Sequence, residues 1–146
     1  MTDIRIENGR KMEKLLKVVG PTGAAIKKEN EWDLLVYITD QDEENIWIEM
    51  CEMDHIGRDP VMDPFMKIQL KRNSDGHITQ AIPVAYQSDN LFSGRTDINE
   101  NGEIFLNLQL IETKKGELDR RLESWLQSID LIGYLEEPHE ILFRES

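Results

Sequence analysis

The stretch MKIQLKRNSDGHITQAIPVAY, residues 66–86, decides the fold class. Its first half, Met66 to Lys71, alternates apolar and polar side chains, the two-residue period of a strand with one buried face. Asn73 to Gly76 is a strong turn signal, and the alternation resumes at Ile78. Two strands joined by so short a turn must be antiparallel, because a parallel pair needs a crossover of about a dozen residues or more. Pro83 cannot donate a ladder hydrogen bond, so we expect an edge or a bulge there.

The same period recurs on both sides of this hairpin. Residues 32–39 and 46–53 alternate in the same way around the polar turn 40–45, so they predict a second hairpin. Residues 104–111 predict a final strand. By contrast, the glycine and prolines of residues 54–64 predict an irregular segment.

A helix is predicted before the strands. Apolar residues between Met12 and Val19 follow a 3.6-residue period, which places them on one face of a helix. Asn8 is a suitable N-cap, and Gly20 followed by Pro21 is a typical stop signal.

A second helix is predicted after the strands. The apolar stripe of residues 114–132 has the helical period, with Thr113 as the candidate N-cap and Gly133 as the residue that ends the helix. The tail that follows is too apolar to be disordered, and its segment 141–143 is a candidate for a short docking strand.

These elements predict an α+β fold. We expect an antiparallel meander of about five strands with the N-terminal and C-terminal helices packed on one face. The length of 146 residues fits a single domain over residues 1–146. Tyr37 and Trp47 fall on the second face of the sheet, so we expect that face to be partly covered by a helix or a partner.

Composition excludes several functional classes. The formal net charge of −12 argues against direct nucleic-acid binding, which needs Lys and Arg to displace counterions. No apolar run is long enough to span a membrane, and the charged N-terminus does not resemble a signal peptide. The single cysteine, Cys51, fits a reducing compartment, so we expect a cytoplasmic protein.

A doubled acidic motif occurs where the third strand begins. Asp59-Pro-Val-Met62 is followed at once by Asp63-Pro-Phe-Met66. Asp before Pro favours a tight polar corner, which suits either a structural turn or a recognition edge. The nearby Cys, His, Met and Asp residues lack paired ligands at metal spacing, so we expect neither a metal nor a cofactor.

Catalysis is the alternative for this region. An enzyme could use Cys51 with His55, or the carboxylates of Asp59 and Asp63. Cys51 and His55 would lie about 13 Å apart on a strand, so only a tight turn after Met53 could bring them together. No phosphate-binding loop, dinucleotide fingerprint or nucleophile elbow is present, and no catalytic residue is assigned.

The candidate interaction surface is polar. The loop after Tyr86 collects side chains that form directional hydrogen bonds, and loops on rigid sheets are where binding residues concentrate. The acidic turn between the first two strands carries a dense negative charge. The candidate residues are Asp42, Glu43, Glu44, Asp59, Asp63, Tyr86, Gln87, Asp89 and Asn90.

Three short motifs resemble an uncharacterised bacterial family. They are Asp59-Pro-Val-Met62, the segment from Pro83-Val-Ala-Tyr86 to Leu91, and Leu122-Glu-Ser-Trp125-Leu126 with Ile132-Gly133-Tyr134. The family is a domain of unknown function found in bacteria and their mobile genetic elements, and the resemblance covers residues 55–135. It implies a bacterial or mobile-element setting and assigns no catalytic residue.

A small acidic protein without a catalytic set is most simply a protein-binding module. We expect a protein partner, and the two-sided strands make a homodimer reasonable. One alternative is an inhibitor from a phage or mobile element whose carboxylates imitate nucleic-acid charge. The enzyme described above is the other alternative.

Overall fold

A six-stranded antiparallel sheet is the centre of the molecule. The computed structural model describes residues 3–56, 59–87, 96–98, 104–106 and 116–144, and for 55–56, 59–63, 87, 96–98 and 104–106 it describes the backbone alone. The strands are β1 Gly23–Lys27, β2 Asp33–Gln41, β3 Asn45–Ile56, β4 Asp59–Arg72, β5 Ile78–Gln87 and β8 Glu140–Phe143. Their order across the sheet is β5-β4-β3-β2-β1-β8, and each neighbouring pair is antiparallel.

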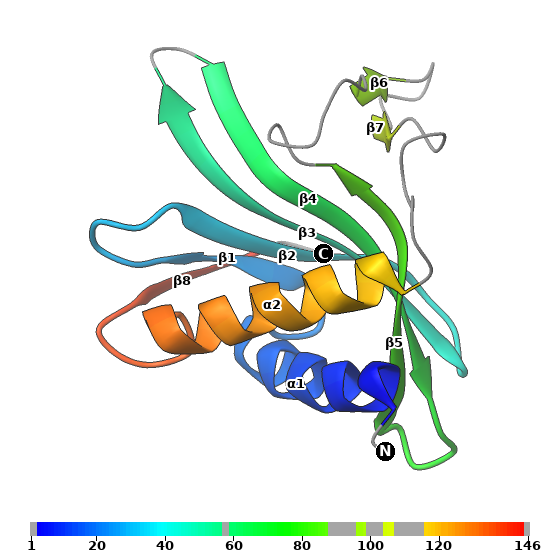
Figure 1. Cartoon of the computed structure of the whole chain (residues 1–146). Coiled ribbons are helices and arrows are strands. Elements are labelled where there is room, and N and C mark those ends of the chain that lie inside the picture. Colours follow the sequence, from blue (N-terminus) through cyan, green and yellow to red (C-terminus); the bar gives the residue numbers. More distant parts are fainter. Residues whose placement is uncertain (1–2, 57–58, 88–95, 99–103, 107–115, 145–146) are drawn as a thin grey trace.

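Two helices lie on the same side of this sheet. They are α1, Ile4–Val19, and α2, Glu117–Ile132, and Figure 1 shows both in front of the strands. The α+β class with an N-terminal and a C-terminal helix is therefore confirmed, and the sheet has six strands where about five were expected. The main core lies between the helices and the sheet, and its largest fully buried members include Met12, Leu15, Ile26, Leu34, Ile48, Met50, Ile68, Leu70 and Leu122.

Helix α1 begins earlier than the sequence suggested. Asp3 is its N-cap, and the Asp3 carboxylate accepts a hydrogen bond of 2.9 Å from the backbone N–H of Arg5. The expectation of Asn8 as the cap was wrong. Asn8 is fully buried inside the helix, and its side-chain amide donates to the carbonyl of Asp119 in α2 at 3.1 Å. Asparagine favours N-caps, but here Asn8 forms a contact between the two helices.

Helix α2 follows its sequence pattern closely. Its stripe of Leu118, Leu122, Trp125, Leu126 and Ile129 is buried, and Gly133 ends the helix in the left-handed conformation, with φ 86°. The helix begins at Glu117, after Gly116, rather than at residue 114. The expected cap Thr113 lies outside the described residues.

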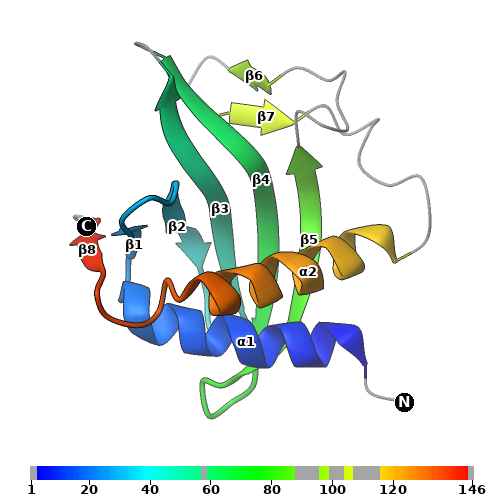
Figure 2. The ribbon, with the colours of Figure 1, turned by 60° about the vertical axis from the view of Figure 1, so that its left-hand side comes forward.

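Residues 54–64 are largely strand, contrary to the irregular segment expected. β3 runs to Ile56 and β4 starts at Asp59, so the two form a hairpin arm that extends beyond β5 (Figure 2). The pairing of β4 with β5 stops at Phe65, so Pro60 and Pro64 fall where β4 is paired on one side only. Proline is tolerated there because the missing N–H is not needed by a second neighbour.

The sheet is completed by two strands near the ends of the chain. β8 confirms the expected docking strand at 141–143, and it pairs with the short strand β1. The expectation that residues 104–111 form the final strand of this sheet was wrong. Its described part, β7, Ile104–Leu106, pairs with β6, Thr96–Ile98, in a separate two-stranded sheet. Residues 107–111 lie outside the described residues.

The face of the sheet opposite the helices carries a second, smaller apolar cluster. Leu35, Cys51, Phe65 and Ala85 are buried there, and Tyr37 packs against them. The guanidinium of Arg144 lies 4.9 Å from the centre of the Tyr37 ring. Part of the cover expected over this face therefore comes from the chain itself.

Candidate functional site

The acidic turn between β2 and β3 is built around the carboxylate of Asp42. One oxygen of Asp42 accepts hydrogen bonds from the backbone N–H groups of Glu44, at 2.8 Å, and Asn45, at 2.7 Å. These two bonds are the main cause of a lowered pKa for Asp42, and the Asn45 side chain and the charge of Arg72 lower it further. Asp42 therefore holds the shape of the turn, whereas the side chains of Glu43 and Glu44 are exposed.

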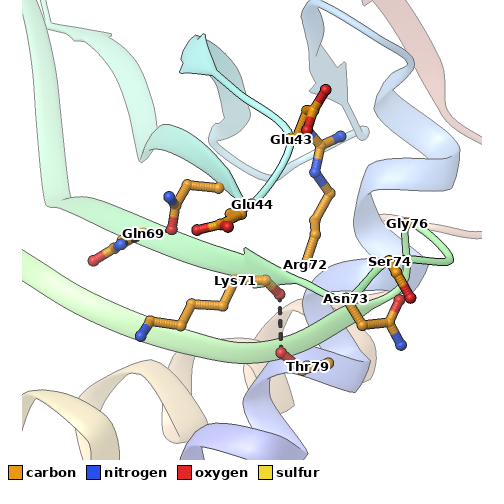
Figure 3. Close-up of a pocket in the computed structure, with 10 residues that line it drawn as sticks. Glu43, Glu44, Gln69, Lys71, Arg72, Asn73, Ser74, Gly76 and Thr79 are labelled. Carbon is orange, nitrogen blue, oxygen red and sulfur yellow. Dashed lines mark hydrogen bonds between the residues drawn. The ribbon is translucent and has the colours of Figure 1, made fainter.

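A polar groove lies between this turn and the β4–β5 turn (Figure 3). Its volume is about 870 Å³. The Arg72 guanidinium donates to the backbone carbonyl of Asp42, which ties the two turns together. The Gln69 amide donates to the side-chain oxygen of Asn45 at 2.8 Å, and the Thr79 hydroxyl donates to the carbonyl of Lys71 at 3.2 Å. The lining residues are Glu43, Glu44, Asn45, Gln69, Lys71, Arg72, Asn73, Ser74, Gly76 and Thr79.

This groove combines both signs of charge with neutral hydrogen-bonding groups. Glu43 and Glu44 supply carboxylates, and Lys71 and Arg72 supply an ammonium and a guanidinium. None of the described lining residues has an apolar side chain. The groove can therefore bind a polar or charged chain segment through hydrogen bonds and ion pairs, and it offers little to an apolar ligand.

Tyr86 lies at a different place, beside the start of α2. The Arg121 guanidinium is 5.4 Å from the centre of the Tyr86 ring, and Arg121 also pairs with Glu117 at 2.9 Å. A cavity of about 450 Å³ is lined by these three residues together with Arg120 and Ser124. Tyr86 is thus part of a small, largely basic surface. The other residues of this surface belong to α2, which the sequence analysis did not connect with Tyr86.

The Asp59 and Asp63 backbones lie on the β3–β4 arm. Asp59 pairs with Ile56, and Asp63 falls in a bulge where the register of β4 against β3 shifts. Gln87 pairs with Phe65 at the end of β5, and Asp89 and Asn90 lie outside the described residues. The acidic turn precedes β3 and Asp59 follows it, so the structure does not bring these parts of the candidate surface together.

Strand β3 carries both Cys51 and His55, the proposed thiol–imidazole pair. Cys51 and His55 are four residues apart on one continuous strand, with no tight turn between them. Cys51 is 4% exposed. Burial, together with the negative charges of Glu49 and Glu52, raises the pKa of its thiol to about 12. Such a thiol is a poor nucleophile at neutral pH.

A buried polar network behind α2 was missed in the sequence. The Trp125 indole donates to a carboxylate oxygen of Glu52 at 2.8 Å, and the Tyr134 hydroxyl lies 3.3 Å from the other. The same hydroxyl donates to the backbone carbonyl of Trp32. Burial raises the pKa of Tyr134, and the charge of Glu52 adds to the shift. The signal was available, because Glu52 continues the apolar row Ile46, Ile48 and Met50.

This network joins α2 to the sheet and has a structural role. Both oxygens of Glu52 are engaged by residues that follow or belong to α2. Buried polar groups with such partners fix the position of one element against another. These contacts therefore direct the Glu52 carboxylate toward α2 and not toward a ligand.

Comparisons of the chain with protein-family models, with curated proteins and with solved structures returned no match. Within the described ranges, neither helix is long and apolar enough to cross a membrane. The same residues contain no group of three His, Cys, Asp or Glu side chains able to hold a metal ion. Fold and groove together define an acidic α+β protein with a curved antiparallel sheet and a polar, mixed-charge groove between two hairpin turns.

Proposed function

We propose that the chain is a protein-binding module that acts by contact, with the groove between the β2–β3 and β4–β5 turns as its contact site. The observation that carries this proposal is the lining of the groove, which contains two carboxylates, a lysine and an arginine and, among its described residues, no apolar side chain. Pockets for small organic ligands are mostly apolar, whereas the rims of protein interfaces are polar and charged. The partner would present a polar segment that carries both signs of charge.

The groove is held in place before any partner arrives. Asp42 fixes the β2–β3 turn, and Arg72 joins that turn to the end of β4. In the β4–β5 turn, the side-chain oxygen of Asn73 accepts from the backbone N–H groups of Asp75 and His77, each at 3.0 Å. A preorganised site loses little conformational entropy on binding, which favours affinity.

The mixed charge of the groove distinguishes this proposal from imitation of nucleic acid. A mimic presents negative charge to a basic partner, whereas the groove places Lys71 and Arg72 among its carboxylates. The net charge of −12 still has a role, because it would accelerate the approach of a basic partner at low salt. The cytoplasmic location and the bacterial or mobile-element setting belong to this proposal, supported by the single cysteine and by the motifs of residues 55–135.

Site-specific photo-crosslinking in the native cells tests the proposal. A photoreactive residue at Glu43 should yield one discrete cross-linked protein, and Lys71→Glu should abolish that product. With the purified partner, Lys71→Glu should weaken binding about tenfold, because a favourable charge becomes a repulsive one. Lys71 is exposed, so its substitution should leave the fold intact.

Glu29 provides the matched control. It is an exposed glutamate in the β1–β2 connection and does not line the groove. A photoreactive residue at Glu29 should not capture the partner. Equal capture from positions 29 and 43, or no capture from position 43, would contradict the proposal.

A further inference from the structure

Among the described strands, β8 is paired on one side only, so it forms an open edge of the sheet. It is the last strand in the order, with β1 on one side, and Figure 2 shows it at the outer margin of the sheet. Two large apolar side chains at this edge are exposed, Leu142 to 45% and Phe143 to 62%. An open edge flanked by exposed apolar side chains is suited to pairing with another strand.

The direction of the free backbone groups follows from the pairing with β1. The backbone N–H of Arg144 donates to the carbonyl of Gly23 at 2.8 Å. Hydrogen-bonded and non-hydrogen-bonded pairs alternate along an antiparallel ladder. Glu140, Leu142 and Arg144 therefore direct their N–H and C=O groups toward β1, and Ile141 and Phe143 direct theirs toward the open edge.

The sequence of this edge is complementary to itself. In an antiparallel arrangement with a two-fold axis at Leu142, Ile141 pairs with Phe143 of the second copy, and both have outward backbone groups. The same register places Glu140 opposite Arg144 of the second copy at two symmetric positions. The Arg144 guanidinium lies over Tyr37 in the single chain, so it turns toward the open edge to pair with Glu140 of the second copy. Opposite charges and apolar pairs across an antiparallel ladder are both stabilising.

We propose that two copies of this chain pair through β8 in this register and form one continuous sheet. The two outward pairs, Ile141 with Phe143 and its symmetry equivalent, complete four backbone hydrogen bonds. On the helix side of the sheet, each Phe143 gains an apolar neighbour. On the opposite side, the two Leu142 side chains meet at the axis.

The other edge of the sheet is less suited to this role. β5 contains Pro83, which lacks an N–H, and its register against β4 shifts between the partners of Lys67 and Ile68. A bulge and a proline both interrupt a continuous row of hydrogen-bonding groups. Self-pairing is therefore assigned to β8.

β8 is also held rigidly before it meets a second copy. The connection between α2 and β8 is fixed by Lys28, whose ammonium donates to the carbonyls of Gly133, at 3.0 Å, and of Glu136 and Pro138, each at 3.2 Å. The Thr22 hydroxyl donates to the carbonyl of Arg144 just after the strand. A preorganised edge pairs at a lower entropic cost than a disordered tail.

Charge exchange combined with sedimentation velocity tests the register. Wild-type protein should dimerise as its concentration rises from micromolar to millimolar. Glu140→Arg and Arg144→Glu should each weaken dimerisation about tenfold or more, because like charges then face each other at two places. The double variant E140R/R144E restores opposite charges and should recover the dimer. Circular dichroism of each variant reports whether the monomer is folded.

Amide hydrogen exchange on the wild-type protein supplies a readout that needs no variant. In the dimer, the amides of Ile141 and Phe143 should exchange slowly, and dilution should make them fast. The amides of Leu142 and Arg144 point toward β1 and should stay protected in both states, so they are the internal control.

Three results would overturn the proposal. The first is a monomer at millimolar concentration with fast exchange at Ile141 and Phe143. The second is a dimer that ignores both single substitutions or leaves these two amides unprotected, which would place the interface elsewhere. The third is protection of these amides only when a different protein is added, which would assign the edge to a foreign strand.

Discussion

At the scale of single residues, the same chemical group has different roles in different surroundings. Asp42 and Glu43 are neighbours in an acidic turn, yet the Asp42 carboxylate is occupied by backbone N–H groups and the Glu43 carboxylate is exposed. Composition predicts an acidic turn without showing which carboxylates remain available. The difference arises because a short aspartate side chain reaches its own turn, which a glutamate does less readily.

Cys51 gives a direct test at this scale. Its buried thiol has a pKa raised to about 12, so the thiolate fraction at neutral pH is about a thousandfold below that of a free cysteine. We expect iodoacetamide to alkylate the native protein at least about a thousandfold more slowly than the urea-unfolded protein. Mass spectrometry over time gives both rates. Comparable rates would show that the thiol is accessible and reactive, which would revive the thiol form of the enzyme hypothesis.

At the scale of elements, α1 and β5 approach each other closely at Gly9. A Cβ atom built on Gly9 would lie 3.1 Å from both the N and the Cα of Gln80, which are backbone atoms of β5. Glycine in a helix interior normally costs about 1 kcal/mol relative to alanine. Here the absence of a side chain permits the contact between helix and sheet.

Gly9→Ala should therefore destabilise the protein, the opposite of its usual effect in a helix. We expect the free energy of unfolding to fall by about 1–3 kcal/mol, because the strand backbone must shift to admit the methyl group. Urea denaturation measures the change. Ser128→Ala, at an exposed position of α2, is the control and should be neutral or slightly stabilising. A stabilised Gly9→Ala protein would show that the two elements can separate without cost.

Elements with a long, regular pattern could be predicted from sequence, and so could the short apolar strand β8, whereas β1 and the proline-interrupted β3–β4 arm could not. The buried stripe of α2 and the hairpin of β4 and β5 follow directly from their periods. β1 has only five residues, two of them alanine, which is a weak strand former. The β3–β4 arm could not be predicted, because Pro60 and Pro64 argue against a strand. A strand tolerates them only where it lacks a neighbour on one side, and the sequence does not show where neighbours lie.

At the scale of the whole molecule, two carboxylates make stability depend on pH. A hydrogen bond with the His77 imidazole is the main cause of a lowered pKa for Glu13, which also accepts from the backbone N–H of Ile78. Asp42 has a lowered pKa through its own turn. A carboxylate with a lower pKa in the folded state stabilises the protein above its unfolded pKa, and this contribution is lost as the pH falls through the folded value.

We therefore expect the free energy of unfolding to decrease as the pH falls below about 5. Combining Glu13→Gln with Asp42→Asn should make this decrease shallower, because neither amide binds a proton in this range. Urea denaturation at a series of pH values gives both slopes. Parallel slopes for the wild type and the double variant would contradict the assignment to these two groups.

The position of β8 beside β1 also has a consequence for biosynthesis. β1 is translated early and β8 last among the described elements, yet they are adjacent in the finished sheet. While the chain is still on the ribosome, β1 can pair with β2 but lacks its second neighbour. Contacts between such distant segments form late and slow folding. Nascent chains stalled before residue 140 would therefore expose β1 as the edge, and β1 is the place where a chaperone would protect the growing protein.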